Sequence, residues 1–254
     1  MTHPVAADGF GQEASTYDRV RPSYPGELVD WVATNLSTDD AGVVADVGAG
    51  SGIFTRLLVP RCPDLIAVEP VATMRAICAA SLPAVPVVGA TGESLPFRDE
   101  SLAAITVAQA FHWFDATNAF AEFARVLQPG GRIALFWNTR DRSLPWTDRL
   151  WGMVAETEHD APWGDAEHWH TTALVDTPHF GPRHNATFHH EQLLTPDEIV
   201  ARVQSVSHVA VLPEAERAAL LDRVRELLRT DPATAGREEI PLPYRVDAYW
   251  AART

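Results

Sequence analysis

The sequence is poor in cysteine, short of basic residues and without any long hydrophobic run. Its two cysteines cannot form a disulfide framework and indicate a reducing compartment. Because 34 acidic residues outnumber 20 basic ones, the formal net charge of −14 disfavours nucleic acids and anionic membrane surfaces as partners. No apolar stretch is long enough to span a membrane, and residues 1–12 lack the pattern of a secretory signal. We therefore expect a cytoplasmic protein that binds neither nucleic acid nor membrane.

Glycine and proline are present, but not in a repeat. Fifteen Gly and 19 Pro without periodicity exclude a collagen-like or low-complexity chain, and 46% apolar residues are too many for a disordered one. A length of 254 residues suits one α/β domain, with or without an inserted cap.

Strand-like and helix-like segments alternate between about residues 25 and 138, which predicts a parallel sheet with helices on both faces. The expected helices are 28–36, 53–59, 72–81 and 116–127, and the expected strands are 43–47, 65–68, 85–88, 102–107 and 132–138. Asp115 is a candidate cap for the fourth helix, and Pro86 indicates that its strand lies at a sheet edge.

The pattern changes after Arg140. Residues 141–182 show weak periodicity, and we interpret them as an insertion packed over the edge of the sheet. A capping box at Thr195 and Glu198 predicts a helix to about residue 207, an apolar stripe predicts another helix over 220–228, and 244–252 reads as a last strand.

The most informative segment is 46–52, Asp-Val-Gly-Ala-Gly-Ser-Gly, between the first strand and a helix. Glycines there allow positive φ and let a ligand approach the backbone closely. Glu69 ends the second strand, where its carboxylate can accept hydrogen bonds from ribose hydroxyls. Ile53 stands where a dinucleotide fingerprint requires glycine, which disfavours a nicotinamide dehydrogenase. These features predict a nucleoside site for a ligand that carries no pyrophosphate.

Several motifs resemble those of the class I S-adenosylmethionine-dependent methyltransferases, in the same order. Residues 46–52 resemble motif I, and 68–70 are similar to the acid that ends the second strand. Residues 93–97 resemble the family's E-x-L-P-F, 108–114 follow the fourth strand, and 127–131 are close to L-x-P-G-G. In addition, 17–25 resemble the opening of the trans-aconitate methyltransferase-like branch.

The resemblance implies a single domain over 1–254 with a seven-stranded Rossmann-like sheet. The sheet would be mostly parallel with an antiparallel last strand, helices on both faces and a small helical cap. Its parts would be an N-terminal lid and first helix over 10–36, a cofactor-binding core over 40–140, an insertion lining the acceptor site over 141–182, and C-terminal strands and helices over 183–254.

The resemblance also implies the cofactor S-adenosyl-L-methionine, with S-adenosyl-L-homocysteine as product. Asp46 would be oriented toward the amino group of the methionine, Glu69 toward the ribose, and Gln109 toward the carboxylate or the acceptor mouth. The implied cofactor-binding residues are Tyr17, Arg21, Asp46, Gly48, Ala49, Gly50, Glu69, Pro70, Thr91, Gly92, Glu93, Ala108 and Gln109. The family often has Asp where this chain has Thr91.

On the acceptor side, His112 is the candidate general base, because the loop after the fourth strand faces the reactive methyl in this fold. The alternative is a packed histidine within an aromatic patch. Candidate substrate-binding residues are Tyr24, Trp113, Phe114, Trp137 and Arg140, although Trp113 and Phe114 also fit a hydrophobic core and Tyr24 could staple the first helix.

Three functions remain open at this point. The leading one is methyl transfer to a small-molecule acceptor, by a monomer or homodimer. The others are a cyclisation, decarboxylation or rearrangement in the same cofactor pocket, and a non-catalytic protein that senses the cofactor. A metal site is not expected: His168 and His170 could chelate an ion from one face of a strand, but neither the 189–191 run nor another stretch supplies a clear third ligand at fixed spacing.

Overall fold

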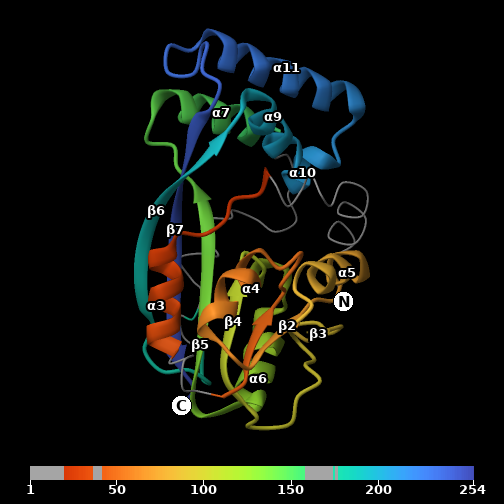
Figure 1. The fold of residues 1–254 in the computed structure, drawn as a ribbon, viewed down its shortest axis with the longest axis vertical. Helices are drawn as coiled ribbons and strands as arrows, with labels where there is room; N and C mark the ends of the chain where they lie inside the picture. The colour runs from red at the N-terminus through yellow and green to blue at the C-terminus, as the bar shows by residue number, and fades with distance from the viewer. Residues whose placement is uncertain (1–19, 37–41, 158–173, 175–176) are drawn as a thin grey trace.

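The protein is a mixed α/β structure built on one seven-stranded sheet (Figure 1). The computed structural model describes residues 20–36, 42–157, 174 and 177–254. The strand order is β3-β2-β1-β4-β5-β7-β6. The strands are β1 Val44–Val47, β2 Leu65–Val68, β3 Val87–Val88, β4 Leu102–Ala108, β5 Leu127–Arg140, β6 His184–Leu194 and β7 Ile240–Ala252.

Strands β1 to β5 run parallel, and β7 runs antiparallel to both of its neighbours, β5 and β6. The prediction of a seven-stranded, mostly parallel Rossmann-like sheet with an antiparallel last strand is therefore confirmed. The two-residue β3 lies at one edge of the sheet, as Pro86 indicated.

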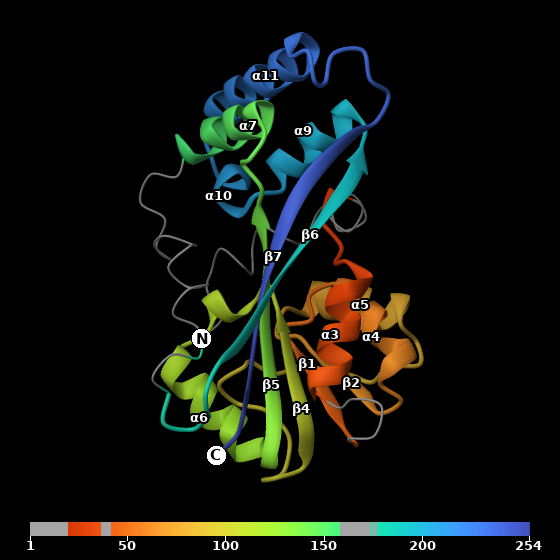
Figure 2. The ribbon, with the colours of Figure 1, turned by 90° about the vertical axis from the view of Figure 1, so that its left-hand side faces the viewer.

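Helices cover both faces of this sheet (Figure 2). The helices are α3 Gly26–Leu36, α4 Ile53–Leu58 and α5 Ala72–Ser81 on one face, and α6 Ala116–Val126 on the other. Alternation along the strands divides the core between the two faces: Ile105 and Leu135 pack with α6, and Ala104 and Phe136 pack with α3 and α4. Asp115 caps α6 by accepting a hydrogen bond from Asn118 N at 3.1 Å, as predicted.

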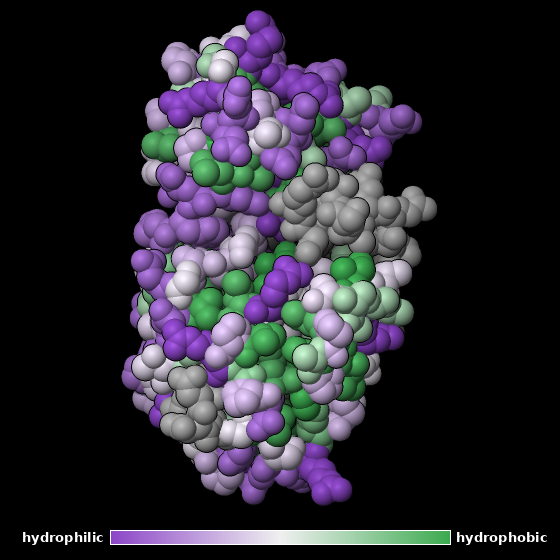
Figure 3. All heavy atoms as spheres, in the orientation of Figure 1, coloured by the Kyte–Doolittle hydropathy of each residue, from purple (hydrophilic) through white to green (hydrophobic). Residues whose placement is uncertain are grey.

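Three strands continue beyond this core and carry a second layer of helices, which we call the cap (Figures 1 and 2). The cap helices are α7 Pro145–Ala155, α9 Pro196–Gln204, α10 Ser207–Ala210 and α11 Glu214–Thr230. They enclose a hydrophobic cluster of their own, into which β7 inserts Leu242 and Tyr244. The outer surface of the cap over α11 is strongly hydrophilic, whereas apolar residues gather over the core (Figure 3).

Two elements of this region differ from expectation. Within 141–182, α7 packs with α9 and α11 in the cap, so this part does not cover the sheet edge as predicted. The second difference is β6, whose polar residues gave no strand signal. It forms because all eleven residues pair with β7, so that tertiary pairing outweighs weak intrinsic propensity.

Candidate active site

The glycine turn lies at the carboxyl end of β1, facing the cap. Gly48, Gly50 and Gly52 have φ of +74°, +59° and +89°, a region that side chains other than glycine rarely adopt. The N–H groups of Gly48 and Ala49 both donate to the carbonyl of Val68, at 2.8 and 3.0 Å. The turn is therefore fixed to the end of β2.

The three glycines are required for different reasons. A Cβ on Gly48 would lie 2.5 Å from the Cβ of Ala110, and one on Gly52 would lie 2.9 Å from the Sγ of Cys78. Nothing lies within 4 Å of the corresponding position on Gly50. Gly48 and Gly52 therefore permit close packing of the protein, and Gly50 presents bare backbone on an open side.

Glu69 binds the glycine turn directly. Its Oε2 accepts from Gly50 N at 2.8 Å and its Oε1 accepts from Val71 N at 2.8 Å. Burial raises the pKa of Glu69, and these two backbone hydrogen bonds oppose that rise. Arg75 donates to the carbonyls of Glu69 and Pro70 and holds the end of β2 in place. An ionised carboxylate has further lone pairs, so Glu69 can also accept from a ligand hydroxyl.

Asp46 does not face the open side of the turn, contrary to expectation. It is fully buried, and its two carboxylate oxygens accept from the hydroxyls of Thr55 at 2.6 Å and Thr106 at 2.8 Å. Burial raises its pKa from 3.8 to about 6, although both hydroxyls act to lower it. Asp46 therefore ties β1 to α4 and β4 beneath the turn.

Phe114 joins the glycine turn to the loop after β3. A Cβ on Gly92 would lie 2.8 Å from the Phe114 ring, and one on Gly48 would lie 3.4 Å from it. Glu93 accepts from Asp115 N at 2.9 Å, which fixes the same loop from the other side. The structure thus places Phe114 as a support beneath two loops, and Thr91 stands half-buried beside Gly92.

Gln109 links the carboxyl ends of β4 and β5. It follows the half-buried Ala108 and has φ +55°, an unusual value for a residue with a side chain. Its N donates to Phe136 O at 2.9 Å, and its Oε1 accepts from Asn138 N at 2.7 Å. A strained backbone held by such bonds is typical of a functional site.

His112 lies in the short 3-10 helix Phe111–Trp113, which begins two residues after Gln109. The indole Nε1 of Trp137 lies 3.4 Å from His112 Nδ1, and the Trp113 ring is 4.8 Å away, centre to centre. Because an indole N–H can only donate, Nδ1 is the acceptor, and a neutral His112 carries its proton on Nε2. Trp137 itself is 1% exposed and belongs to the core.

Residues 20–25, which precede α3, connect the core with the cap. Arg21 donates from Nη2 to Ser205 O, at the end of α9, at 2.7 Å. Tyr24 packs edge-on against Phe54 and Phe136, with ring centres 5.3 and 5.4 Å away, so it is half-buried against the core. Tyr17 lies outside the described residues.

Sequence reasoning missed a polar cluster at the end of β5. Asn138 Nδ2 donates to Ser23 O at 3.1 Å, which leaves its Oδ1 to accept from His190 Nε2 at 2.8 Å. Burial lowers the pKa of His190 to about 4, so this histidine is neutral at physiological pH. It stacks on Tyr244 with ring centres 5.5 Å apart. The signal for this cluster is the pairing of His190 with Tyr244 between β6 and β7. The sequence did not predict β6, so it could not predict this pairing.

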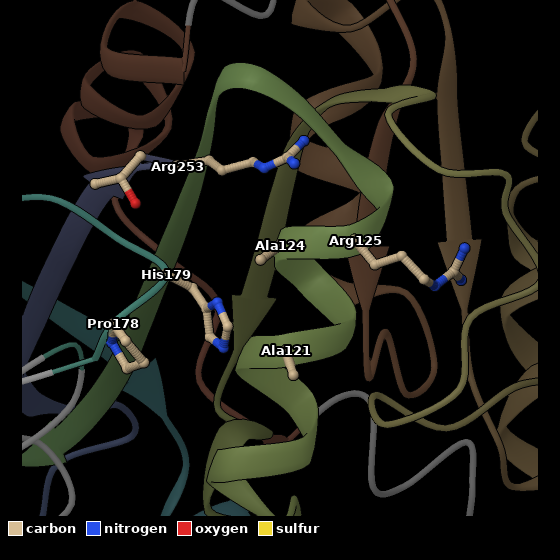
Figure 4. A pocket seen from close by; sticks show the side chains of 7 residues that line it. Ala121, Ala124, Arg125, Pro178, His179 and Arg253 are labelled. Atoms are coloured by element: carbon tan, nitrogen blue, oxygen red, sulfur yellow. The ribbon is translucent and has the colours of Figure 1, made fainter.

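Other candidate sites are less well placed. Among the described residues, no group of three or more His, Cys, Asp or Glu is arranged to hold a metal ion. A cavity of about 380 Å³ lies beside α6 (Figure 4), away from the carboxyl ends of the strands. It is lined by Ala121, Ala124, Arg125, Pro178, His179, Arg253 and Thr254. No helix in the described part of the chain is long and apolar enough to cross a membrane.

A Rossmann-like sheet with a glycine turn after β1 and an acid ending β2 is the arrangement typical of nucleoside-binding α/β proteins. Residues 45–135 match the family model described as "Methyltransferase domain". An uncharacterized methyltransferase of Mycobacterium tuberculosis is 39% identical over 235 residues, covering 92% of this chain and 91% of the relative. A methyltransferase-like protein of Schizosaccharomyces pombe is 29% identical over 250 residues, covering 98% and 97%.

A solved structure from Anaeromyxobacter dehalogenans, described provisionally as a type II methyltransferase, superimposes with a TM-score of 0.70 at 24% identity, covering 91% of this chain and 97% of that one. The chain belongs to the class I methyltransferase family. Its resemblance to the trans-aconitate methyltransferase-like branch stays a prediction.

The burial of Asp46 predicts a particular pH dependence of stability. Between pH 3.8 and about 6 the carboxyl ionises in the unfolded chain while it stays protonated in the folded one, so stability falls as pH rises through this window. Asp46→Asn removes this loss. Relative to wild type, its free energy of unfolding should rise by up to about 3 kcal/mol between pH 4 and pH 7. Urea unfolding of both proteins at both pH values measures this difference in the free energy of unfolding.

Asp64→Asn is the matched control, because Asp64 is exposed and should show no such change. A constant difference between Asp46→Asn and wild type at both pH values would contradict the account.

Proposed function

We propose that the protein transfers a methyl group from S-adenosyl-L-methionine to a small-molecule acceptor by in-line displacement. The observation that carries the proposal is the pair formed by Gly50 and Glu69, in which open backbone and an acceptor carboxylate lie 2.8 Å apart at the carboxyl ends of β1 and β2. Membership of the methyltransferase family supports the reaction type.

The residues present fit this cofactor. Gly50 leaves open space where a Cβ would otherwise stand, so a ribose can approach the backbone. Glu69 would accept from the two ribose hydroxyls, and the loop of Thr91, Gly92 and Glu93 would lie beside the base. Asp46 would act by holding the turn, through Thr55 and Thr106, instead of binding the amino group itself.

When bound, the cofactor supplies a methyl group on a sulfonium, and the electron pair of the breaking C–S bond stays with sulfur. The protein therefore has mainly to align the acceptor and exclude water. Gln109 and Asn138 fix the ends of β4 and β5 on what would be the acceptor side, and the cap helices lie beyond these strand ends (Figure 1). Arg140, at the end of β5, lies with its Cζ 4.9 Å from the centre of the Trp151 ring in the cap.

His112 has two possible uses in this arrangement. With its proton on Nε2 it can donate to the acceptor and orient it. To act as a general base it must use Nδ1 and give up the contact with Trp137. Trp113 would lie on the same side and help to shield the acceptor from water.

Glu69→Gln tests the cofactor site. An amide can accept with only one atom and presents an N–H₂ group to Gly50 N or to the ribose, so we expect affinity for S-adenosyl-L-homocysteine to fall by at least about tenfold. Isothermal titration calorimetry measures it. Glu191→Gln, on the exposed side of β6, is the control and should bind like wild type. Failure of wild type to bind either form of the cofactor would overturn the proposed function.

His112→Ala tests the acceptor side. Tritium transfer from labelled S-adenosyl-L-methionine to a metabolite extract should fall by about 100-fold while S-adenosyl-L-homocysteine still binds, because acid–base or orienting groups typically contribute this much. His184→Ala, an exposed histidine at the start of β6, should leave the rate unchanged. An unchanged rate in His112→Ala would remove His112 from the mechanism.

A further inference from the structure

The cap contains a buried arginine with no acidic partner in the described part of the chain. Arg202, on α9, is 6% exposed. Its Nε donates to the hydroxyl oxygen of Tyr244 at 3.1 Å, and its Nη1 donates to the hydroxyl oxygen of Ser205 at 3.3 Å. Among the described residues no carboxylate pairs with it, and its Nη2 makes no hydrogen bond.

This absence contrasts with the rest of the cap. Several exposed arginines there have an acidic partner: Arg142 lies 2.7 Å from Asp148, and Arg223 lies 2.9 Å from Glu156. The chain has 34 acidic residues and its 20 cationic residues are all arginine, so acids are abundant. A buried cation without a counter-charge is costly, and buried charges in proteins are normally paired.

Two further hydrogen-bond donors beside Arg202 lack acceptors among the described residues. The Tyr244 oxygen accepts from Arg202, and its own O–H donates to no described residue. The indole Nε1 of Trp151 is buried without a partner. The Trp151 ring centre lies 5.9 Å from the Cζ of Arg202 and 4.9 Å from that of Arg140. Two guanidinium groups thus lie near one indole ring, and the two neutral donors Tyr244 and Trp151 lie beside them.

Contacts connect this place to the carboxyl ends of the core strands. Tyr244 stacks on His190, His190 Nε2 donates to Asn138, and Asn138 N donates to Gln109. Gln109 is followed by Ala110, which lies against the glycine turn. Arg140 and Tyr244 are also partners in the β5–β7 ladder. The donor cluster therefore lies where the cap meets the candidate active site.

We propose that Arg202, together with Arg140, Tyr244 and Trp151, binds an oxyanion of the methyl acceptor, a carboxylate or a phosphate. The guanidinium fork matches both groups and stays charged at all physiological pH values. The inference rests on the proposed function, and it makes Arg202 a specificity-determining residue of the acceptor site. The acceptor is then an anion, although the protein itself carries a net charge of −14.

The test divides a metabolite extract by anion exchange before the reaction. Retained and unretained fractions are each incubated with wild type and tritium-labelled S-adenosyl-L-methionine. We expect label transfer only with the retained fraction. Loss of transfer after phosphatase treatment of that fraction would assign a phosphate, and survival of transfer would assign a carboxylate. Transfer confined to the unretained fraction would overturn the proposal.

Variants then separate binding from structural support. In Arg202→Met, the amount of retained fraction needed for half-maximal transfer should rise roughly 10- to 100-fold, the effect of losing a charge-assisted hydrogen bond. Arg202→Lys keeps the charge, so the amount of retained fraction that it needs should lie between those of wild type and Arg202→Met. Arg225→Met, at an exposed arginine of α11, should behave like wild type.

Thermal unfolding and affinity for S-adenosyl-L-homocysteine check that Arg202→Met folds. Should it fail to fold, Arg202→Lys and the fractionation still decide the question. Equal transfer by Arg202→Met and wild type would overturn the role of Arg202. If wild type transferred label to neither fraction, the result would count against methyl transfer itself. Transfer to the unretained fraction would count only against an anionic acceptor.

Discussion

The hydrogen bond from Gly50 N to Glu69 holds together the part of the structure on which the rest of the site depends. It joins the turn after β1 to the end of β2 at the point where the backbone is open to a ligand. Its geometry requires positive φ in the turn, and close packing of Ala110 against Gly48 requires that no side chain stand there. The buried Asp46 carboxylate and the Phe114 ring then fix this turn to α4, β4 and the neighbouring loop.

Beyond the turn, the length of three strands determines where the cap lies relative to the glycine turn. Because β5, β6 and β7 continue past the core, the cap helices stand opposite the carboxyl ends of β1 and β4 (Figures 1 and 2). Asn138 and His190 lie along these strands. The side chain of Asn138 donates to Ser23 O and accepts from His190 Nε2, so it links the segment before α3 to β6. Burial keeps His190 neutral. The cap thus contributes polar groups to the junction as well as covering it.

The sequence was sufficient to predict the order of helices and strands up to Asn138, and the resemblance to the methyltransferases predicted the seven-stranded sheet. These depend on local signals: buried apolar strands, the cap at Asp115, and glycines directly before a helix. The cap side of the site was not predictable in the same way. Arg202 reads in sequence as one polar residue of an amphipathic helix, and only the packing of α9 against α7 and β7 shows that it is buried beside Trp151 and Tyr244. The prediction for Asp46 failed for a related reason. The sequence shows only that Asp46 precedes the turn, whereas the structure shows that its carboxylate accepts from the hydroxyls of Thr55 and Thr106.

The central claim is that the turn at Gly50 and the carboxylate of Glu69 bind an adenosyl ligand. A crystal structure of the protein grown with S-adenosyl-L-homocysteine tests it most directly. The account predicts both ribose hydroxyls within hydrogen-bond distance of the Glu69 carboxylate, with the sugar against the open face of Gly50. Ligand density elsewhere, with that face of Gly50 filled by protein or solvent, would contradict it.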